Sequence, residues 1–214
     1  MYDDDMYPVQ FSVDYPEEPR NRLTALVRII LAIPILVVLT LIGGYVTTDQ
    51  SQEFDPDLFV VALVATGGIW LATLLMILFR HKYPRWWFDW GLELNRFSAR
   101  VGAYILLWRD EYPSTDEEQA VHLDIAYPDV EGQLNRFMPL VKWLLAIPHY
   151  IVLMVLWLVV FVLTIIAWFA ILIVGRYPRG MFDFVVGVDR WSYRIIAYDF
   201  LLTKYRYPPF RLSE

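Results

Sequence analysis

Two short segments of the chain alternate apolar and polar residues, and each is followed by a much longer apolar stretch. Residues 9–15 and 121–127 place Val, Phe, Leu, Ile and Tyr at every second position. This period of two is typical of a β-strand with one buried face. Each segment ends at a Tyr-Pro pair, where proline disfavours a regular continuation. Because a lone strand is unstable, we expect the two to pair with each other or with another extended segment.

The apolar stretches are long enough to cross a membrane, which takes about 20 residues. In the first half of the chain, residues 23–46 and 58–79 flank the polar segment 47–57, and this pattern predicts a helical hairpin. In the second half, residues 137–174 are apolar without a polar interruption.

A single straight helix over that second stretch would measure about 57 Å at 1.5 Å per residue, well beyond a hydrocarbon core of about 30 Å. Two alternatives follow: one long helix, or two short helices joined by a tight turn near residues 159–163. We favour the second, because the chain repeats itself and a repeated module must end on the same side of the membrane.

A helical pattern follows each apolar stretch. Large apolar residues recur there at alternating intervals of four and three, as on one face of an α-helix. Basic residues lie beside this stripe, so the helix either lies in the headgroup region or packs on the rest of the protein. The stripe residues are Trp90, Leu94, Phe97, Val101, Tyr104 and Trp108, and then Phe184, Val188, Trp191, Ile195, Tyr198 and Leu202.

The two halves also match in sequence. NRLTALVRIILAIP at 21–34 returns as NRFMPLVKWLLAIP at 135–148, and the segment 83–104 returns at 177–198. We therefore divide the chain into a first repeat, 1–113, and a second repeat, 114–214. The predicted fold is a mainly α membrane protein with four transmembrane helices in two tandem hairpins, two amphipathic interfacial helices and a small cytoplasmic β-sheet.

Composition and charge agree with a membrane location. The chain is 57% hydrophobic, with a mean hydropathy of +0.41, above the roughly 45–50% of soluble domains. All 18 Lys and Arg residues lie outside the segment 47–57, which carries four acidic residues. The positive-inside rule then predicts a multi-pass membrane protein with both termini cytoplasmic. The two repeats would be related by a two-fold axis along the membrane normal. The acidic N-terminus does not resemble a signal peptide, and a net charge of −6 gives no support to a nucleic-acid partner.

The sequence offers little that points to catalysis. It has no cysteine and no nucleotide-binding, hydrolase or zinc-protease motif. His149 lies in an apolar stretch without a second ligand at helical spacing, so we expect no metal and no cofactor. Asp89 and Asp183 are candidate general bases only if a substrate pocket adjoins them. We expect a protein that is not an enzyme.

The candidate binding residues are basic and aromatic side chains near the predicted membrane boundary. Arg28 and Lys142 occupy equivalent positions inside their apolar stretches, where a charge either grips an anionic group or extends to the nearby interface. Arg85 and Arg179 belong to matching Tyr-Pro-Arg segments, which form either a headgroup cleft or a structural turn. The full set predicted to bind lipids or partners is Arg28, Lys142, Arg85, Trp86, Trp87, Arg96, Arg100, Arg179, Arg190, Trp191 and Arg194.

The segment LAIP at 145–148 and the segment GRYPRGMFDFVVGVDRWSYRIIAYDFLLTKYRYPPF at 175–210 resemble the bacterial membrane family catalogued as domain of unknown function 4389. The resemblance extends to the first repeat, which departs from the pattern with WWFDW, NRFSAR and YPS. It implies an integral membrane protein of a bacterium or archaeon, and it supplies no reaction and no catalytic residue.

Two functions are compatible with these features. The first is a non-enzymatic membrane scaffold or accessory subunit whose cytoplasmic aromatic and basic face binds lipid headgroups and other membrane protein subunits. The alternative is a small transporter or lipid-moving protein with a site between the two hairpins, which the kinking prolines Pro34 and Pro148 would help to open.

Overall fold

The computed structural model describes residues 7–43, 72–128, 138–199 and 207–213. Most of these residues are helical. The elements are β1 (Val9–Val13), α1 (Arg22–Gly43), the short π-helix η1 (Met76–Arg80), α3 (Arg85–Ile105), β2 (Val121–Ile125), α5 (Met138–Val174) and α6 (Arg179–Asp199).

The two predicted strands pair with each other in an antiparallel sheet, as one of the sequence alternatives proposed. Phe11 lies opposite Leu123 at the centre, and Val9 and Val13 lie opposite Ile125 and Val121. These apolar side chains are buried on one face of the sheet. The other face carries polar residues, among them exposed Gln10 and His122.

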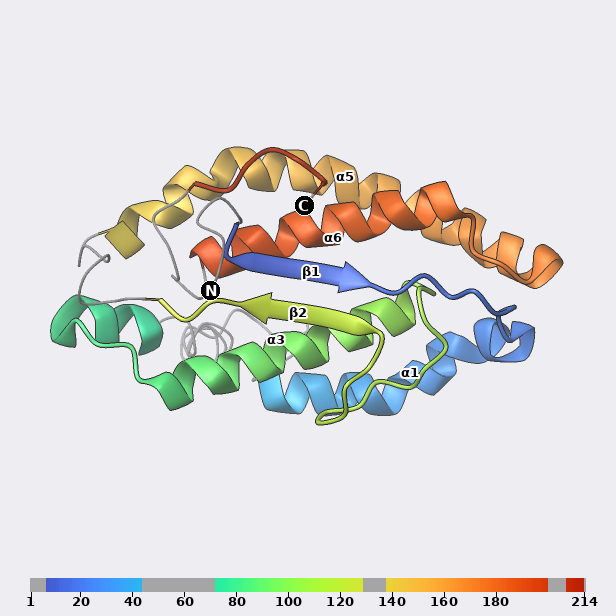
Figure 1. Cartoon of the computed structure of the whole chain (residues 1–214), viewed down its shortest axis with the longest axis horizontal. Coiled ribbons are helices and arrows are strands. Elements are labelled where there is room, and N and C mark those ends of the chain that lie inside the picture. The colour runs from blue at the N-terminus through green and yellow to red at the C-terminus, as the bar shows by residue number, and fades with distance from the viewer. Residues whose placement is uncertain (1–6, 44–71, 129–137, 200–206, 214) are drawn as a thin grey trace, which may run out of the picture.

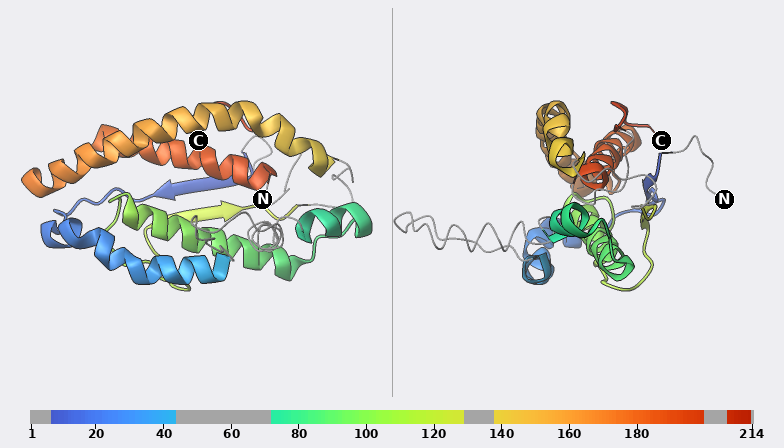
Figure 2. Two further views of the ribbon diagram at one scale, coloured as in Figure 1. Left: turned by 180° about the vertical axis from the view of Figure 1, so that it is seen from behind. Right: turned by 90° about the vertical axis from the view of Figure 1, so that its left-hand side faces the viewer.

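The elements form three layers (Figure 2, right). The sheet is the first layer, and α3 and α6 form the second, with α3 packed on β2 and α6 packed on β1. The third layer consists of α1, which packs on α3, and α5, which packs on α6; these two outer helices also touch each other. Each strand is therefore covered by the helix from the other half of the chain.

Matching elements run in opposite directions. β1 is antiparallel to β2, and the same holds for α1 against α5 and for α3 against α6 (Figure 1). The arrangement approximates a two-fold axis perpendicular to the layers. As a result, α3 and α6 begin at opposite ends of the long axis of the molecule.

The Tyr-Pro-Arg segments begin these two helices in the same way. The carbonyl of Pro84 accepts hydrogen bonds from the amides of Trp87 and Phe88, at 3.1 and 3.2 Å. The carbonyl of Pro178 accepts the equivalent bonds from the second half. Proline suits this position because its fixed φ angle is helical and its missing amide would have no partner inside the helix.

The tight turn predicted near residues 159–163 is wrong. α5 is one continuous helix of 37 residues that passes through this segment. The segment contains only Val, Phe and Leu, none of which provides a turn or the positive φ that a reversal needs. Thr164 donates its hydroxyl to the carbonyl of Val160 within the same helix, so this side chain does not cap an end.

The part of the chain that the structure describes does not contain four spans. Among the described residues, two helices are long and apolar enough to cross a membrane, Arg22–Ile42 and Val141–Val174. The predicted span at 58–79 lies largely outside the described residues; its final part ends in η1, after which His81 adopts a left-handed conformation with φ of 49°. Pro34 and Pro148 both lie inside helices without ending them.

Helices form at both positions where the sequence predicted an amphipathic one. Most residues of the two apolar stripes are buried within the protein: Phe97 and Val101 of α3 pack against Ile35 of α1, and Trp191 of α6 lies against His149 of α5. Trp90 is exposed, and Leu202 lies outside the described residues. These contacts correspond to the alternative in which each helix packs on the rest of the protein. A location of these helices in the headgroup region stays a prediction.

Candidate functional site

The polarity of the α1 and α5 surfaces is reversed relative to that of helices in soluble proteins. The stripe of α1 that faces the protein includes Ala25, Arg28 and Ala32, whereas its outward side chains are large and apolar, with Ile29 84% exposed. The buried stripe of α5 contains Lys142, Ala146, His149, Leu153, Val160, Ala167 and Ile171. Both buried stripes include alanine and a charged residue, whereas the large apolar residues outside are exposed, and this distribution is typical of helices that face lipid.

Arg28 is compensated inside the protein. Its guanidinium donates to the carbonyls of Tyr104 and Arg109 at 2.8 and 2.6 Å and pairs with the carboxylate of Asp110. It also lies over the ring of Tyr104, 4.5 Å from the centroid. The side chain is 3% exposed, so its contacts lie within the protein.

Lys142, at the matching position of α5, is fully buried as well. Its Nζ lies 5.0 Å from the ring centroid of Tyr198, which matches Tyr104. The opposite charge that acts on it is that of Asp199, which also accepts a hydrogen bond from the hydroxyl of Tyr150. Burial raises the pKa of the Asp199 carboxyl, whereas Tyr150 and the charge of Lys142 act in the opposite direction.

His149 lies next to this group and is also buried. Its Nδ1 accepts a hydrogen bond of 3.2 Å from the indole nitrogen of Trp191, and Phe210 stacks on its ring at 4.0 Å between centroids. No group of three or more His, Asp or Glu residues that could hold a metal occurs in the described part of the chain. The residues around His149 are aromatic. One of them, Phe210, belongs to the C-terminal segment 207–213.

Arg85 and Arg179 are exposed at the first positions of α3 and α6. Each lies over the ring of a tyrosine that follows a strand in the other half of the chain, Tyr127 at 5.3 Å and Tyr15 at 5.1 Å. The hydroxyls of these tyrosines donate to the backbone carbonyls of the Tyr-Pro-Arg segments. Trp86 is exposed beside Arg85, and the indole nitrogen of the half-buried Trp87 donates to Thr73.

Arg96 and Arg190 connect the helices to the sheet by equivalent bonds. The Nε of Arg96 donates to the carbonyl of Leu123, and the Nε of Arg190 donates to that of Phe11, both at 2.8 Å. Leu123 and Phe11 face each other at the centre of the sheet. Both arginines therefore fix a helix from one half of the chain to the strand from the other half.

Arg100 and Arg194, one turn further along the same helices, are buried. Arg100 donates to the carbonyl of Ser114 at 3.0 Å, and Arg194 donates to the carbonyls of Arg211 and Ser213 at 3.0 and 2.6 Å. In both cases these bonds hold the segment that follows the helix.

Two cavities lie at equivalent places where these arginines meet the sheet. One has a volume of about 270 Å³ and is lined by Arg96, Arg100 and two acidic residues, Glu118 and Asp124, among others. The other has a volume of about 280 Å³ and is lined by Tyr7, Val9, Gln10, Phe11, Ser12, Arg190 and Arg194. The two differ in charge, because the described lining of the second contains no acidic residue.

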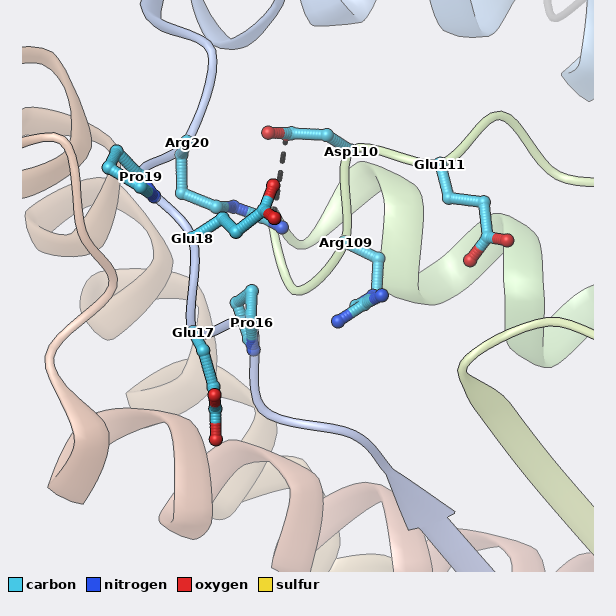
Figure 3. A pocket seen from close by; sticks show the side chains of 8 residues that line it. All are labelled: Pro16, Glu17, Glu18, Pro19, Arg20, Arg109, Asp110 and Glu111. Carbon is cyan, nitrogen blue, oxygen red and sulfur yellow. Dashed lines mark ion pairs between the residues drawn. The ribbon is translucent and has the colours of Figure 1, made fainter.

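A third cavity, of about 250 Å³, lies where the chain approaches α1 (Figure 3). Its lining mixes acidic, basic and proline side chains, and Arg20 and Asp110 form an ion pair of 3.5 Å across it. Arg20 also donates to the carbonyl of Leu107 at 2.6 Å. Burial lowers the pKa of Arg20 to about 10, although the charge of Asp110 opposes this change.

The predicted binding residues do not form one continuous face. Arg28, Lys142, Arg100, Trp191 and Arg194 are buried; Arg96, Arg190 and Trp87 are half-buried; and Arg85, Trp86 and Arg179 are exposed. Sequence reasoning missed Arg20, Asp110 and Asp199. The one signal that pointed to the two acids was the need of Arg28 and Lys142 for a counter-charge.

Comparison with known proteins shows that part of the chain is similar to one protein family. Residues 139–211 are similar to the family described as Domain of unknown function (DUF4389). No curated protein and no solved structure matches the chain. The matched region comprises α5, α6 and most of the C-terminal segment that packs on them, and its description names no activity.

Proposed function

We propose that the protein is a non-enzymatic integral membrane scaffold or accessory subunit, anchored through α1 and α5, of a bacterial or archaeal inner membrane. Its exposed arginines and aromatic residues would contact lipid headgroups, and its polar sheet layer would contact protein partners. The observation that carries the membrane part of this proposal is the reversed polarity of α1 and α5. Exposing so many large apolar side chains to water would be unfavourable.

We also propose that the chain consists of two tandem copies of one module. Equivalent bonds in the two halves support this reading: the pairs made by Arg96 and Arg190, by Tyr127 and Tyr15, and by the cations Arg28 and Lys142 over tyrosine rings. The register of the sheet supports it further, because Phe11 and Leu123 occupy equivalent positions and pair with each other.

The hydrogen bonds of the buried arginines favour a scaffold over an enzyme. Arg28, Arg100 and Arg194 donate to backbone carbonyls of other segments, which stabilises the protein itself. The transport alternative requires a polar cavity between α1 and α5. The cavities described above lie beside the sheet and at the start of α1, and transport stays a prediction.

Extraction of the protein from membranes tests the anchoring. We expect wild-type protein to remain in the membrane pellet at alkaline pH in carbonate and to be released by detergent. Release by carbonate alone would contradict the proposal. As a test of the scaffold role, native mass spectrometry after mild solubilisation should detect bound phospholipid or a partner subunit. A protein free of both in several mild detergents would contradict that role.

A further inference from the structure

We infer that the layer formed by α1 and α5 lies parallel to the membrane plane, in contact with the acyl chains of one leaflet, with the sheet on the side facing water. This inference rests on the proposed membrane location and adds the orientation. Four features of the molecule support it.

The polarity of the molecule changes along its shortest axis. The layer of α1 and α5 lies farthest from the sheet (Figure 2, right), and large apolar side chains such as Ile29, Met154 and Ile173 are exposed on it. The outward face of the sheet carries Gln10 and His122. A molecule that is apolar on one broad face and polar on the opposite one suits an interface parallel to those faces.

The length of α5 does not suit a transverse orientation. Its apolar part, Val141–Val174, has 34 residues and measures about 51 Å at 1.5 Å per residue. To fit a hydrocarbon core of about 30 Å, the helix would need a tilt of about 54°, beyond the usual range of about 0–40°. Parallel placement removes this mismatch.

The sheet provides the third argument. β1 and β2 run along the same long axis as the helices (Figure 1), so a transverse molecule would carry the sheet into the hydrocarbon. In the described part of the chain the sheet has two strands, and each therefore has an outer edge without a neighbouring strand. Open sheet edges and an Asp14–His122 pair do not suit lipid, since their polar groups would lose water.

Exposed basic residues occur at both ends of the long axis. At the end where α1 and α6 begin, these are Arg22, Arg176 and Arg179; at the other end, they are Arg80, Lys82 and Arg85. A transverse molecule would place one of these groups on the exterior side, against the positive-inside rule. In a parallel molecule both groups lie at one headgroup level, where they would attract anionic lipid.

A depth profile along α5 tests the orientation. The chain has no cysteine, so the full-length protein accepts single spin labels directly through Leu144→Cys, Leu158→Cys and Ile173→Cys, which lie on the exposed side of α5. The labelled proteins are placed in vesicles of phosphatidylglycerol and phosphatidylcholine. Collision with oxygen and with a water-soluble nickel chelate is then measured by electron paramagnetic resonance. Gln10→Cys and His122→Cys, on the sheet, serve as water-exposed controls.

We expect the three α5 labels to show equal depth, with strong oxygen contact and weak nickel contact, and the two sheet labels to show the reverse. A deep Leu158→Cys label between two shallow labels would overturn the parallel orientation while leaving the membrane anchoring intact. Strong nickel contact at all three α5 positions would instead overturn the anchoring itself.

Discussion

At the scale of single residues, the molecule buries positive charges and supplies each with a different partner. Arg28 has the carboxylate of Asp110 and two backbone carbonyls, whereas Lys142 has a tyrosine ring and the charge of Asp199. The difference follows from side-chain shape, because a guanidinium can bond to several acceptors at once and an ammonium acts as a compact charge. Loss of either cation would remove a positive charge from a carboxylate that keeps other partners, Arg20 in the case of Asp110 and Tyr150 in the case of Asp199.

We predict that Arg28→Met destabilises the protein by about 2–3 kcal/mol. Breaking a buried ion pair from one side costs about 3–5 kcal/mol, and the partial exposure of Asp110 lowers this value. The thermal unfolding midpoint in detergent measures the effect.

The matched control for Arg28→Met is Arg85→Met. Arg85 is 76% exposed and its pair with Asp89 is 4.0 Å long, so the change should stay below about 1 kcal/mol. Equal losses for the two variants would contradict the role assigned to Arg28.

Asp189 should make stability depend on pH. Burial raises the pKa of its carboxyl from 3.8 to about 7, so between these values the folded protein keeps a proton that the unfolded chain has released. Folding stability therefore falls as pH rises from about 4 to 7. We predict that Asp189→Asn, which introduces the residue found at the equivalent position Asn95, flattens this decline. Thermal unfolding at pH 5 and pH 8 measures it, and parallel profiles for wild type and variant would count against the assignment.

At the scale of elements, local patterns predicted the strands and the helices α3 and α6, because periods of two and about 3.6 depend only on neighbouring residues. The course of α5 was predicted incorrectly. Apolar residues such as Val159 and Leu163 are compatible with a continuous helix and with a pair of short spans. Only the surrounding structure determines which of the two forms.

Candidate site residues were harder to predict than elements. The partner of Arg28 comes from the segment after α3, where Leu107 adopts a positive φ of 65° and the chain turns back to place Asp110 beside α1. A leucine gives no sign of such a conformation in the sequence. Likewise, nothing in the pattern indicated that Phe210 would stack on His149.

The outward face of α5 should tolerate charge in detergent but not in a bilayer. We predict that Met154→Lys leaves the thermal unfolding midpoint in detergent almost unchanged, because this side chain is 75% exposed. In membranes it should weaken retention, because a charged side chain on the face that contacts acyl chains loses its water. The cost of a charge at the centre of a spanning helix, about 2.5–3.5 kcal/mol, is the upper bound for a helix that lies in one leaflet. Flotation of reconstituted vesicles measures retention.

Gln10→Lys, on the exposed face of the sheet, is the control for Met154→Lys and should alter neither property. If both variants floated like the wild type, α5 would not be the surface in contact with lipid.

At the scale of the whole molecule, each half of the chain covers the strand of the other half. α6 lies on β1 and α3 lies on β2, so neither half covers its own strand. If the two halves are copies of one module, as we propose, residues 114–214 alone should form a symmetric dimer in detergent, with a second copy of this segment replacing 1–113. Size-exclusion chromatography with light scattering measures the mass, and a well-folded monomer would contradict this view of the architecture.

The most direct test of the parallel orientation is to determine on which side of the membrane equivalent residues from the two halves of the chain lie. Asp89 and Asp183 are matched, exposed and close to the starts of α3 and α6, at opposite ends of the long axis. In cells that express full-length Asp89→Cys or Asp183→Cys, we measure labelling by a membrane-impermeant maleimide before and after permeabilisation. A layer parallel to the membrane predicts the same result for both variants, with labelling only after permeabilisation if that side is cytoplasmic. Labelling of one variant in intact cells and of the other only after permeabilisation would contradict the account.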